Sequence, residues 1–224
     1  APRLGRIRGL TLAAVYRARA AHGPLERPPN IMKKILLGLA GIIGLAVVGT
    51  LGAAAMQEDH THMERSITVA AAPADLVYYT QDLKGINEWS PWEGKDPTQK
   101  REYSDPSSGV GASYHWIGNE EVGEGTMTIK SISEGKTETD LHFIAPFEGK
   151  AVATISYEAE GDGTKVTWGY DQDNDFGGKM MLVFIDMDAM LGPDYEKGLE
   201  LLKPLAEKAA TERKAKEEAE ATAK

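Results

Sequence analysis

The chain contains no cysteine, and that absence removes several kinds of chemistry. Disulfide bonds, thiol nucleophiles and thiolate metal sites are excluded, while the redox compartment is left open. The sequence also lacks an HExxH, a Walker and a GxGxxG motif, and it shows no Ser-His-Asp order. The chain therefore carries no catalytic signature of these kinds, and we expect no cofactor.

Positive charge is scarce over most of the chain. Residues 1–34 hold eight basic side chains and one acidic one, and residues 35–57 hold no charge. Residues 58–224 then hold 17 basic and 33 acidic side chains, a net charge of −16. Because phosphate contacts need a basic face, we do not expect nucleic acid as a partner of this acidic body.

The uncharged stretch, residues 35–56, is long enough at ~1.5 Å per residue to cross a hydrocarbon layer of ~30 Å. Two interpretations stay open. The length favours an uncleaved transmembrane anchor, and the small residues at 53–55 suit a cleaved secretory signal. Both keep the basic flank in the cytoplasm. We expect a single-pass protein of the inner (plasma) membrane with its folded domain on the periplasmic (extracytoplasmic) side, or a secreted periplasmic protein if the signal is cleaved.

The segments on either side of this stretch are expected to have little fixed structure. Residues 1–34 are rich in Arg, Ala and Pro, and Met32 with two following lysines is typical of a translation start. We therefore expect residues 1–31 to be an upstream extension of the reading frame, with a genuine basic cytoplasmic tail as the alternative. Residues 57–63 are polar and are predicted to be a linker.

The body, residues 64–208, has alternating segments separated by turn signals. A first strand is predicted at Glu64–Ala71, a short helix from Pro73, and a second short helix within Leu83–Trp92. Regular turns between six alternating runs then indicate an antiparallel meander. The expected strands are Gln99–Tyr103, Gly111–Ile117, Val122–Ile132, Thr137–Ile144, Gly149–Glu158 and Lys165–Gln172.

The C-terminal segment is predicted to cover the meander. Along each predicted strand, alternate residues are apolar and the residues between them are polar. One face of the sheet is therefore apolar and must be covered. Helical composition begins at Lys179, Gly192-Pro193 is expected to interrupt it, and an apolar stripe then resumes from Tyr195 to Ala206. Residues 209–224 alternate in charge and are expected to be a solvated helix extension or a frayed tail.

These elements resemble the helix-grip fold of the SRPBCC (START-like) superfamily, in its bacterial polyketide cyclase/dehydrase-like branch. The resemblance covers about residues 64–208. It implies an α+β fold in which a curved antiparallel sheet of six to seven strands wraps around a long C-terminal helix, with a cavity between them. It implies no particular reaction. The matching stretches are Trp89-Ser90-Pro91-Trp92, Gly109-Val110-Gly111-Ala112 with Tyr114 and Trp116, Val122-Gly123-Glu124-Gly125, and Gly192–Leu199 with Leu202-Lys203.

Aromatic residues next to glycines indicate where a ligand would bind. Tyr114 and Trp116 project from one face of a strand, and the glycines between Gly109 and Gly125 suggest that room is kept beside them. An ordinary packed aromatic core is the alternative. The predicted cavity residues are Trp89, Trp92, Tyr114, Trp116, Met127, Phe143, Tyr157, Trp168 and Phe184.

Groups that could perform chemistry or bind a metal are few. Glu88, Tyr114, Tyr157 and Tyr170 could polarise a carbonyl, although each is more often a lining residue. The other candidates are expected to point outward from the cavity, namely His115, His142 and Glu124.

The metal-like patterns are incomplete. His60 and His62 form an H-x-H pair in the predicted linker, but no third ligand is nearby. The acidic run from Asp171 has Phe176 and Leu182 where a calcium loop needs Gly and Glu, so it is predicted to cap the following helix. No metal site is expected.

Three functions remain in view. We favour a membrane-tethered module that binds an apolar small molecule such as a lipid or a polyketide-like compound, because the aromatic face is present and a catalytic set is missing. A cyclase or dehydratase acting on a polyketide-like substrate is the first alternative. An interaction domain whose cavity is filled by its own side chains is the second.

Overall fold

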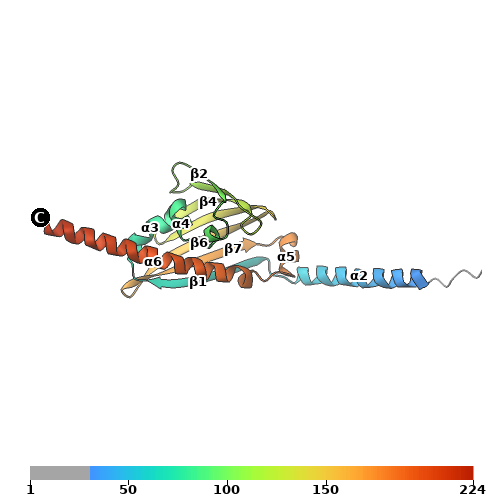
Figure 1. Cartoon of the computed structure of the whole chain (residues 1–224). Coiled ribbons are helices and arrows are strands. Elements are labelled where there is room, and N and C mark those ends of the chain that lie inside the picture. The colour runs from blue at the N-terminus through green and yellow to red at the C-terminus, as the bar shows by residue number, and fades with distance from the viewer. Residues whose placement is uncertain (1–30, 224) are drawn as a thin grey trace, which may run out of the picture. The chain divides into compact units, whose positions relative to one another are not determined.

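The computed structural model describes residues 31–223 of the chain (Figure 1). The basic segment expected to lack fixed structure lies, as far as residue 30, outside the described residues. The chain divides into two compact units between Gly49 and Thr50.

The first described element is the apolar helix α2, Ile31–Ala55. It is long and apolar enough to cross a membrane, and its apolar side chains are exposed in the absence of a bilayer. Such a helix is not the buried core of a soluble domain, because a soluble helix would bury its apolar residues. Its bounds agree with the predicted stretch 35–56, and the choice between anchor and signal stays a prediction.

Seven antiparallel strands form one sheet in the order β1-β7-β6-β5-β4-β3-β2. The predicted meander is confirmed, and the first strand pairs with the last. β1 begins at His60, so part of the predicted linker 57–63 is strand. The strands are β1 His60–Val69, β2 Lys100–Tyr103, β3 Ser113–Ile117, β4 Glu124–Ser133, β5 Lys136–Ala145, β6 Gly149–Glu160 and β7 Gly163–Asp173.

Helices connect the first two strands and follow the last one. They are α3 Pro73–Gln81, α4 Leu83–Glu88, the 3-10 helix η1 Pro91–Gly94, α5 Phe176–Leu182 and α6 Met187–Thr222. Asp175 accepts a hydrogen bond from the Gly178 amide at 2.8 Å, so the acidic run caps α5 as predicted.

The predicted interruption at Gly192-Pro193 is wrong, because α6 continues through it. Asp186 caps the start of α6 by accepting from the Ala189 amide at 3.1 Å. Pro193 removes one backbone donor from the helix. Gly192 is buried where any Cβ would lie 2.3 Å from the Arg65 guanidinium. Packing against the sheet thus outweighs the local preference to break.

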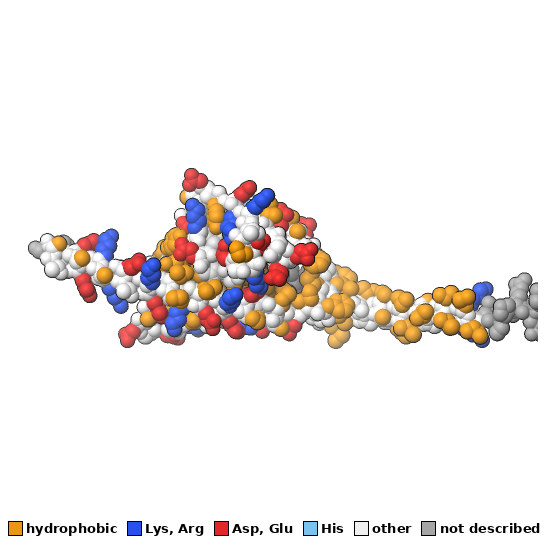
Figure 2. Space-filling view, viewed as in Figure 1, with side chains coloured by type: hydrophobic (Ala, Val, Ile, Leu, Met, Phe, Trp, Pro, Cys, Tyr) orange, Lys and Arg blue, Asp and Glu red, His pale blue; other side chains and the backbone are white. Residues whose placement is uncertain are grey.

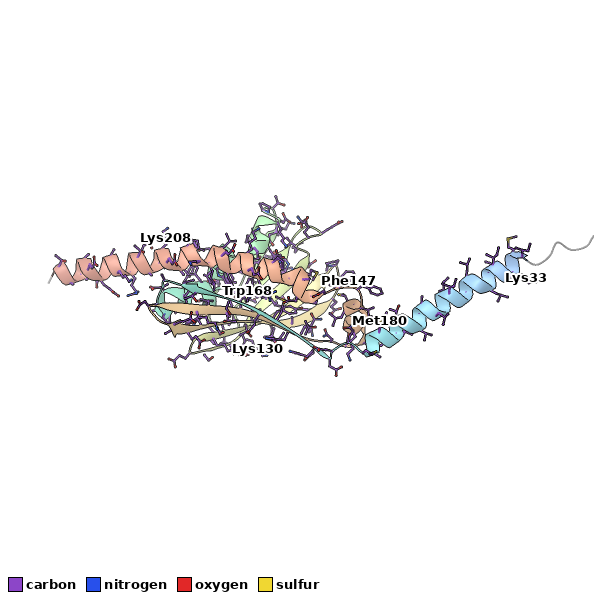
Figure 3. All side chains as sticks on the ribbon, turned by 90° about the horizontal axis from the view of Figure 1, so that it is seen from below. Lys33, Lys130, Phe147, Trp168, Met180 and Lys208 are labelled. Atoms are coloured by element: carbon purple, nitrogen blue, oxygen red, sulfur yellow. The ribbon has the colours of Figure 1, made fainter. Side chains whose placement is uncertain are left out.

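The apolar parity of the strands faces α6, as the alternation predicted. Trp168 of β7 lies beneath α6, whereas Lys130 of β4 projects from the opposite face of the sheet (Figure 3). Within the sheet, α6 packs mainly on β1 and less on β7. The concave face is therefore covered by α6 over only one side.

Charged side chains fix α6 at two places. Near its start, Arg65 of β1 donates to Glu196 at 2.8 Å and to Asp188 at 2.9 Å. Farther along, Arg213 donates to the buried carboxylate of Asp75 on α3 at 2.7 Å. Ala210 is also buried. The first turns of the predicted tail 209–224 are consequently docked, and only the remainder is solvated helix.

Candidate ligand-binding site

The concave face divides into two parts, and the part under α6 is filled with aromatic rings. Trp168 stacks on Tyr195 of α6 with ring centroids 3.9 Å apart. Trp89 and Trp92 meet the same indole edge-on at 4.7 and 5.8 Å. Trp89, Trp168 and Tyr195 are buried. These residues form a packed core, so the predicted cavity residues Trp89, Trp92 and Trp168 do not leave a ligand space among themselves.

The second part lies over β2 to β5, away from α6. Tyr103 stacks on Tyr114 at 4.8 Å, Tyr114 on Trp116 at 5.8 Å, and Phe143 meets Trp116 edge-on at 6.3 Å. Tyr103, Phe143 and the neighbouring Met127 are only partly buried. We call Tyr103, Tyr114, Trp116, Met127 and Phe143 the aromatic strip. It is the part of the concave face that α6 does not cover.

The expectation that Gly125 keeps room for a ligand is wrong. Gly125 lies opposite Trp116 in the register of β3 and β4. A Cβ at Gly125 would lie 2.5 Å from the indole ring and 2.7 Å from the His142 carbonyl oxygen. The glycine therefore makes room for Trp116, and the indole occupies the space that the sequence suggested was open.

Two helices reach the ends of the aromatic face through side-chain amides. Asn87 of α4 donates to the Tyr103 hydroxyl at 2.7 Å, and Gln81 of α3 donates to the Tyr157 hydroxyl at 3.1 Å. Each hydroxyl keeps its own hydrogen to donate to a further acceptor. Tyr157 is thus a partly buried residue beside α3, at the boundary between the two parts of the face.

A polar cluster at the strip was missed by the sequence analysis. Arg101 of β2 pairs with Trp116 in the register and forms an ion pair with Glu93, which also accepts from Gln99 at 3.0 Å. Burial raises the pKa of Tyr114, and the positive charge of the nearby Arg101 offsets this only in part. The phenol therefore stays neutral. The alternation of the strand could have revealed this cluster, because Arg101 is two residues before Tyr103 and therefore points to the same, inward face of the sheet.

Two predicted residues lie away from this site. Phe184 follows α5 and is 74% exposed, so its prediction as a residue of the cavity is wrong. Glu88 accepts a hydrogen bond from the exposed Tyr78 at 2.7 Å, which raises the pKa of Tyr78 to about 12. Glu88 therefore has a partner outside the aromatic strip. Tyr170 is buried and donates to Gln172, its neighbour on β7.

His115, Glu124 and the histidine pair also have partners. His115 lies 3.2 Å from Glu124 on the polar parity, as expected. His60 and His62 belong to β1 rather than to a solvated linker, and both contact Asp171, at 3.2 and 2.7 Å. Among residues 31–223, no group of three or more His, Cys, Asp or Glu is arranged to hold a metal ion.

A single curved sheet around a long helix, with an apolar concave face, defines a helix-grip protein. Residues 60–207 match the sequence profile of the family described as "Polyketide cyclase / dehydrase and lipid transport". The chain belongs to this family, as its motifs indicated. No match was found among proteins of curated function.

Several solved structures are similar to this chain at low identity. A Chromobacterium violaceum protein is 13% identical, with a TM-score of 0.46, and the match covers 66% of this chain and 97% of that one. The Aha1 dimer from Colwellia psychrerythraea is 15% identical, with a TM-score of 0.48 and coverages of 66% and 96%. The di-domain aromatase/cyclase of the steffimycin biosynthetic pathway is 11% identical, with a TM-score of 0.49 and coverages of 68% and 52%.

Proposed function

We propose that this protein binds an apolar small molecule, such as a lipid or a polyketide-like compound, on the aromatic strip, and that α2 anchors it in a membrane. The observation that carries the proposal is the row of aromatic rings over β2 to β5, which α6 does not cover and in which Tyr103 and Phe143 are only partly buried. Ligand sites in proteins are mostly apolar with a few placed polar groups, and Arg101 with the Tyr103 hydroxyl supplies such groups.

The binding proposal is tested by filling the strip. In Met127→Trp a large ring would occupy the strip, and in Thr128→Trp the same ring would stand on the other face of β4. We expect uptake of an apolar fluorescent dye by the full chain in detergent to fall about tenfold for Met127→Trp and to stay unchanged for Thr128→Trp. Equal dye uptake by both variants, with equal unfolding midpoints, would contradict the proposal. Native mass spectrometry of protein from its own host then tests for a bound natural ligand.

The anchoring proposal has its own measurement. The mass of the membrane-extracted chain is expected to include residues 35–56. A mature chain that begins near Met56 or Gln57 would instead show that the segment is a cleaved signal. We place the folded domain on the extracytoplasmic side of the inner membrane, because the basic residues before α2 are retained in the cytoplasm.

A cyclase or dehydratase is the second candidate, and the polar cluster favours it. Tyr114 has a neutral phenol beside Arg101 on the concave face, so it could donate a hydrogen bond to a substrate carbonyl. Tyr114→Phe would then abolish turnover while dye binding is kept. If Tyr114→Phe changes dye binding alone and no polyketide-like substrate is converted by the wild type, this candidate fails.

A further inference from the structure

Exposed apolar side chains from several loops gather along one edge of the sheet, here the edge formed by the ends of the strands and not by an outer strand. β1 begins where β7 ends, since His60 pairs with Asp173, and β4 begins where β5 and β3 end. The helix α5 and the turns after β3 and β5 therefore share this edge. Figure 2 shows hydrophobic side chains gathered over α5. We call the exposed residues of these elements the apolar edge: Ile117, Ile144, Phe147, Phe176 and Phe184.

The exposure at this edge is large and has no explanation within the domain. Phe184 is 74%, Phe147 67% and Phe176 56% exposed. The helix α5 buries none of its residues, although most of its seven side chains are apolar or absent. Phe147 and Met180 lie at the same end of the sheet in Figure 3. Several large apolar side chains exposed at one end of a sheet are typical of an interaction site.

The last residues of α2 belong to the same compact unit as this edge. Ala54 belongs to the compact unit of the sheet and is buried. Gln57, two residues after α2 ends, lines a groove of about 500 Å³ together with Leu182 and Phe184. Two residues span at most ~7 Å. The end of α2 therefore lies within ~7 Å of Gln57, in the wall of the groove that Leu182 and Phe184 also line.

Hydrogen bonds hold this arrangement in place. The Asn174 amide donates to the Asp59 carbonyl at 2.8 Å, and its side-chain nitrogen donates to the Glu58 carbonyl at 3.2 Å. Lys179 of α5 forms an ion pair with the Asp59 carboxylate. These contacts hold residues 58 and 59 against Asn174 and α5, and only Met56 and Gln57 separate them from the end of α2.

We infer that the apolar edge rests in the surface of a lipid bilayer and that Phe147, Phe176 and Phe184 enter its headgroup region. This inference depends on the proposed anchoring by α2. Interfacial segments insert apolar and aromatic side chains to a depth of about 5–10 Å. The charged residues near the apolar edge are mainly acidic, and they include Asp59, Asp175 and Asp186. Attraction to anionic lipid therefore does not contribute to membrane binding at this edge. The opposite edge is polar at its turns, with Glu134 and Asp162.

The test uses the absence of cysteine, because any introduced cysteine is the one label site in the full chain. Phe184→Cys and Phe147→Cys carry an environment-sensitive fluorophore in phosphatidylcholine vesicles with or without brominated acyl chains. Ile43→Cys reports on α2, and Asp162→Cys is the matched exposed control at the far edge. We expect the labels at 43, 184 and 147 to shift to the blue and to be quenched by brominated lipid. The label at 162 is expected to show neither effect.

The outcomes separate this inference from the anchoring proposal. If the label at 43 is quenched while those at 184 and 147 behave like the label at 162, the anchor stands and the inference is overturned. If the label at 43 is not quenched, anchoring fails as well. A blue shift at 184 and 147 without quenching means that a protein, either a second copy or a partner, covers the edge, which also overturns the inference. Unchanged unfolding midpoints verify that each labelled variant is folded.

Discussion

Gly198→Ala adds a single methyl group where α6 touches the sheet. Its Cβ would lie 2.6 Å from the Trp168 ring and 3.2 Å from Pro91. In an exposed helix, Gly→Ala stabilises a protein by up to ~1 kcal/mol. Here both neighbours are rigid rings, and overpacking of a full core costs about 1–3 kcal/mol. We expect the upper half of that range to apply, which leaves a net destabilisation of about 1–2 kcal/mol.

Thermal unfolding of the full chain in detergent, followed by near-ultraviolet circular dichroism of the tryptophans, measures this effect. A loss of 1–2 kcal/mol lowers Tm by about 2–8 °C for a unit of this size. Gly178→Ala in α5 is the control, because its Cβ would meet only ordinary contacts of 3.4 Å or more. Its Tm should stay equal or rise.

Trp168→Phe tests the assigned cause, since it removes the part of the ring that the new methyl group would meet. In that background, Gly198→Ala should no longer destabilise, which a double-mutant cycle detects as a favourable interaction energy. A Tm for Gly198→Ala equal to or above that of the wild type would refute the packing of α6 described above.

Three further predictions concern other contacts. The aspartate partners of His60 raise its pKa above 6.5. Its contribution to stability is therefore present below pH 6.5 and is lost as the pH rises through the higher pKa of the folded state. His60→Gln should flatten this part of the plot of Tm against pH. Gly125→Ala should displace the indole above it, cost about 1–3 kcal/mol in a denaturant titration and weaken dye binding. Arg213→Ala should lower Tm more than Lys216→Ala on the same helix. The pKa of Asp75 lies below 3.8, so that difference should shrink as pH falls through it.

Local patterns were sufficient for most of the fold. The period-two alternation placed Tyr114, Trp116 and Trp168 on the covered face, because that parity is a property of each strand alone. The positions of the turns also depend on local residue types such as Gly, Pro, Asn and Asp. The meander could therefore be predicted from the sequence. The apolar stripe around Leu199 likewise identified the covering helix.

The errors arose where distant residues decide the outcome. Nothing near Gly192 shows that Arg65, far away in the sequence, packs against it and supports an uninterrupted helix. The glycine at 125 is indistinguishable from one that frees space until its register partner Trp116 is known. Phe184 was predicted to be a cavity residue because it lies in an apolar stretch of sequence. Its position along the chain does not show that it follows α5 to an exposed end of the sheet.

The two amide–phenol hydrogen bonds at the aromatic face bear on how a ligand would enter the strip under the proposed function. With α6 pinned through Arg65 and Arg213, access to the strip does not require that helix to swing. Turning the side chains of Gln81 and Asn87 breaks one hydrogen bond each, at about 1 kcal/mol, and frees the tyrosines to rotate. Side-chain rotations are far faster than helix motions. Admission of the proposed ligand would then need only side-chain rotations and no movement of α6.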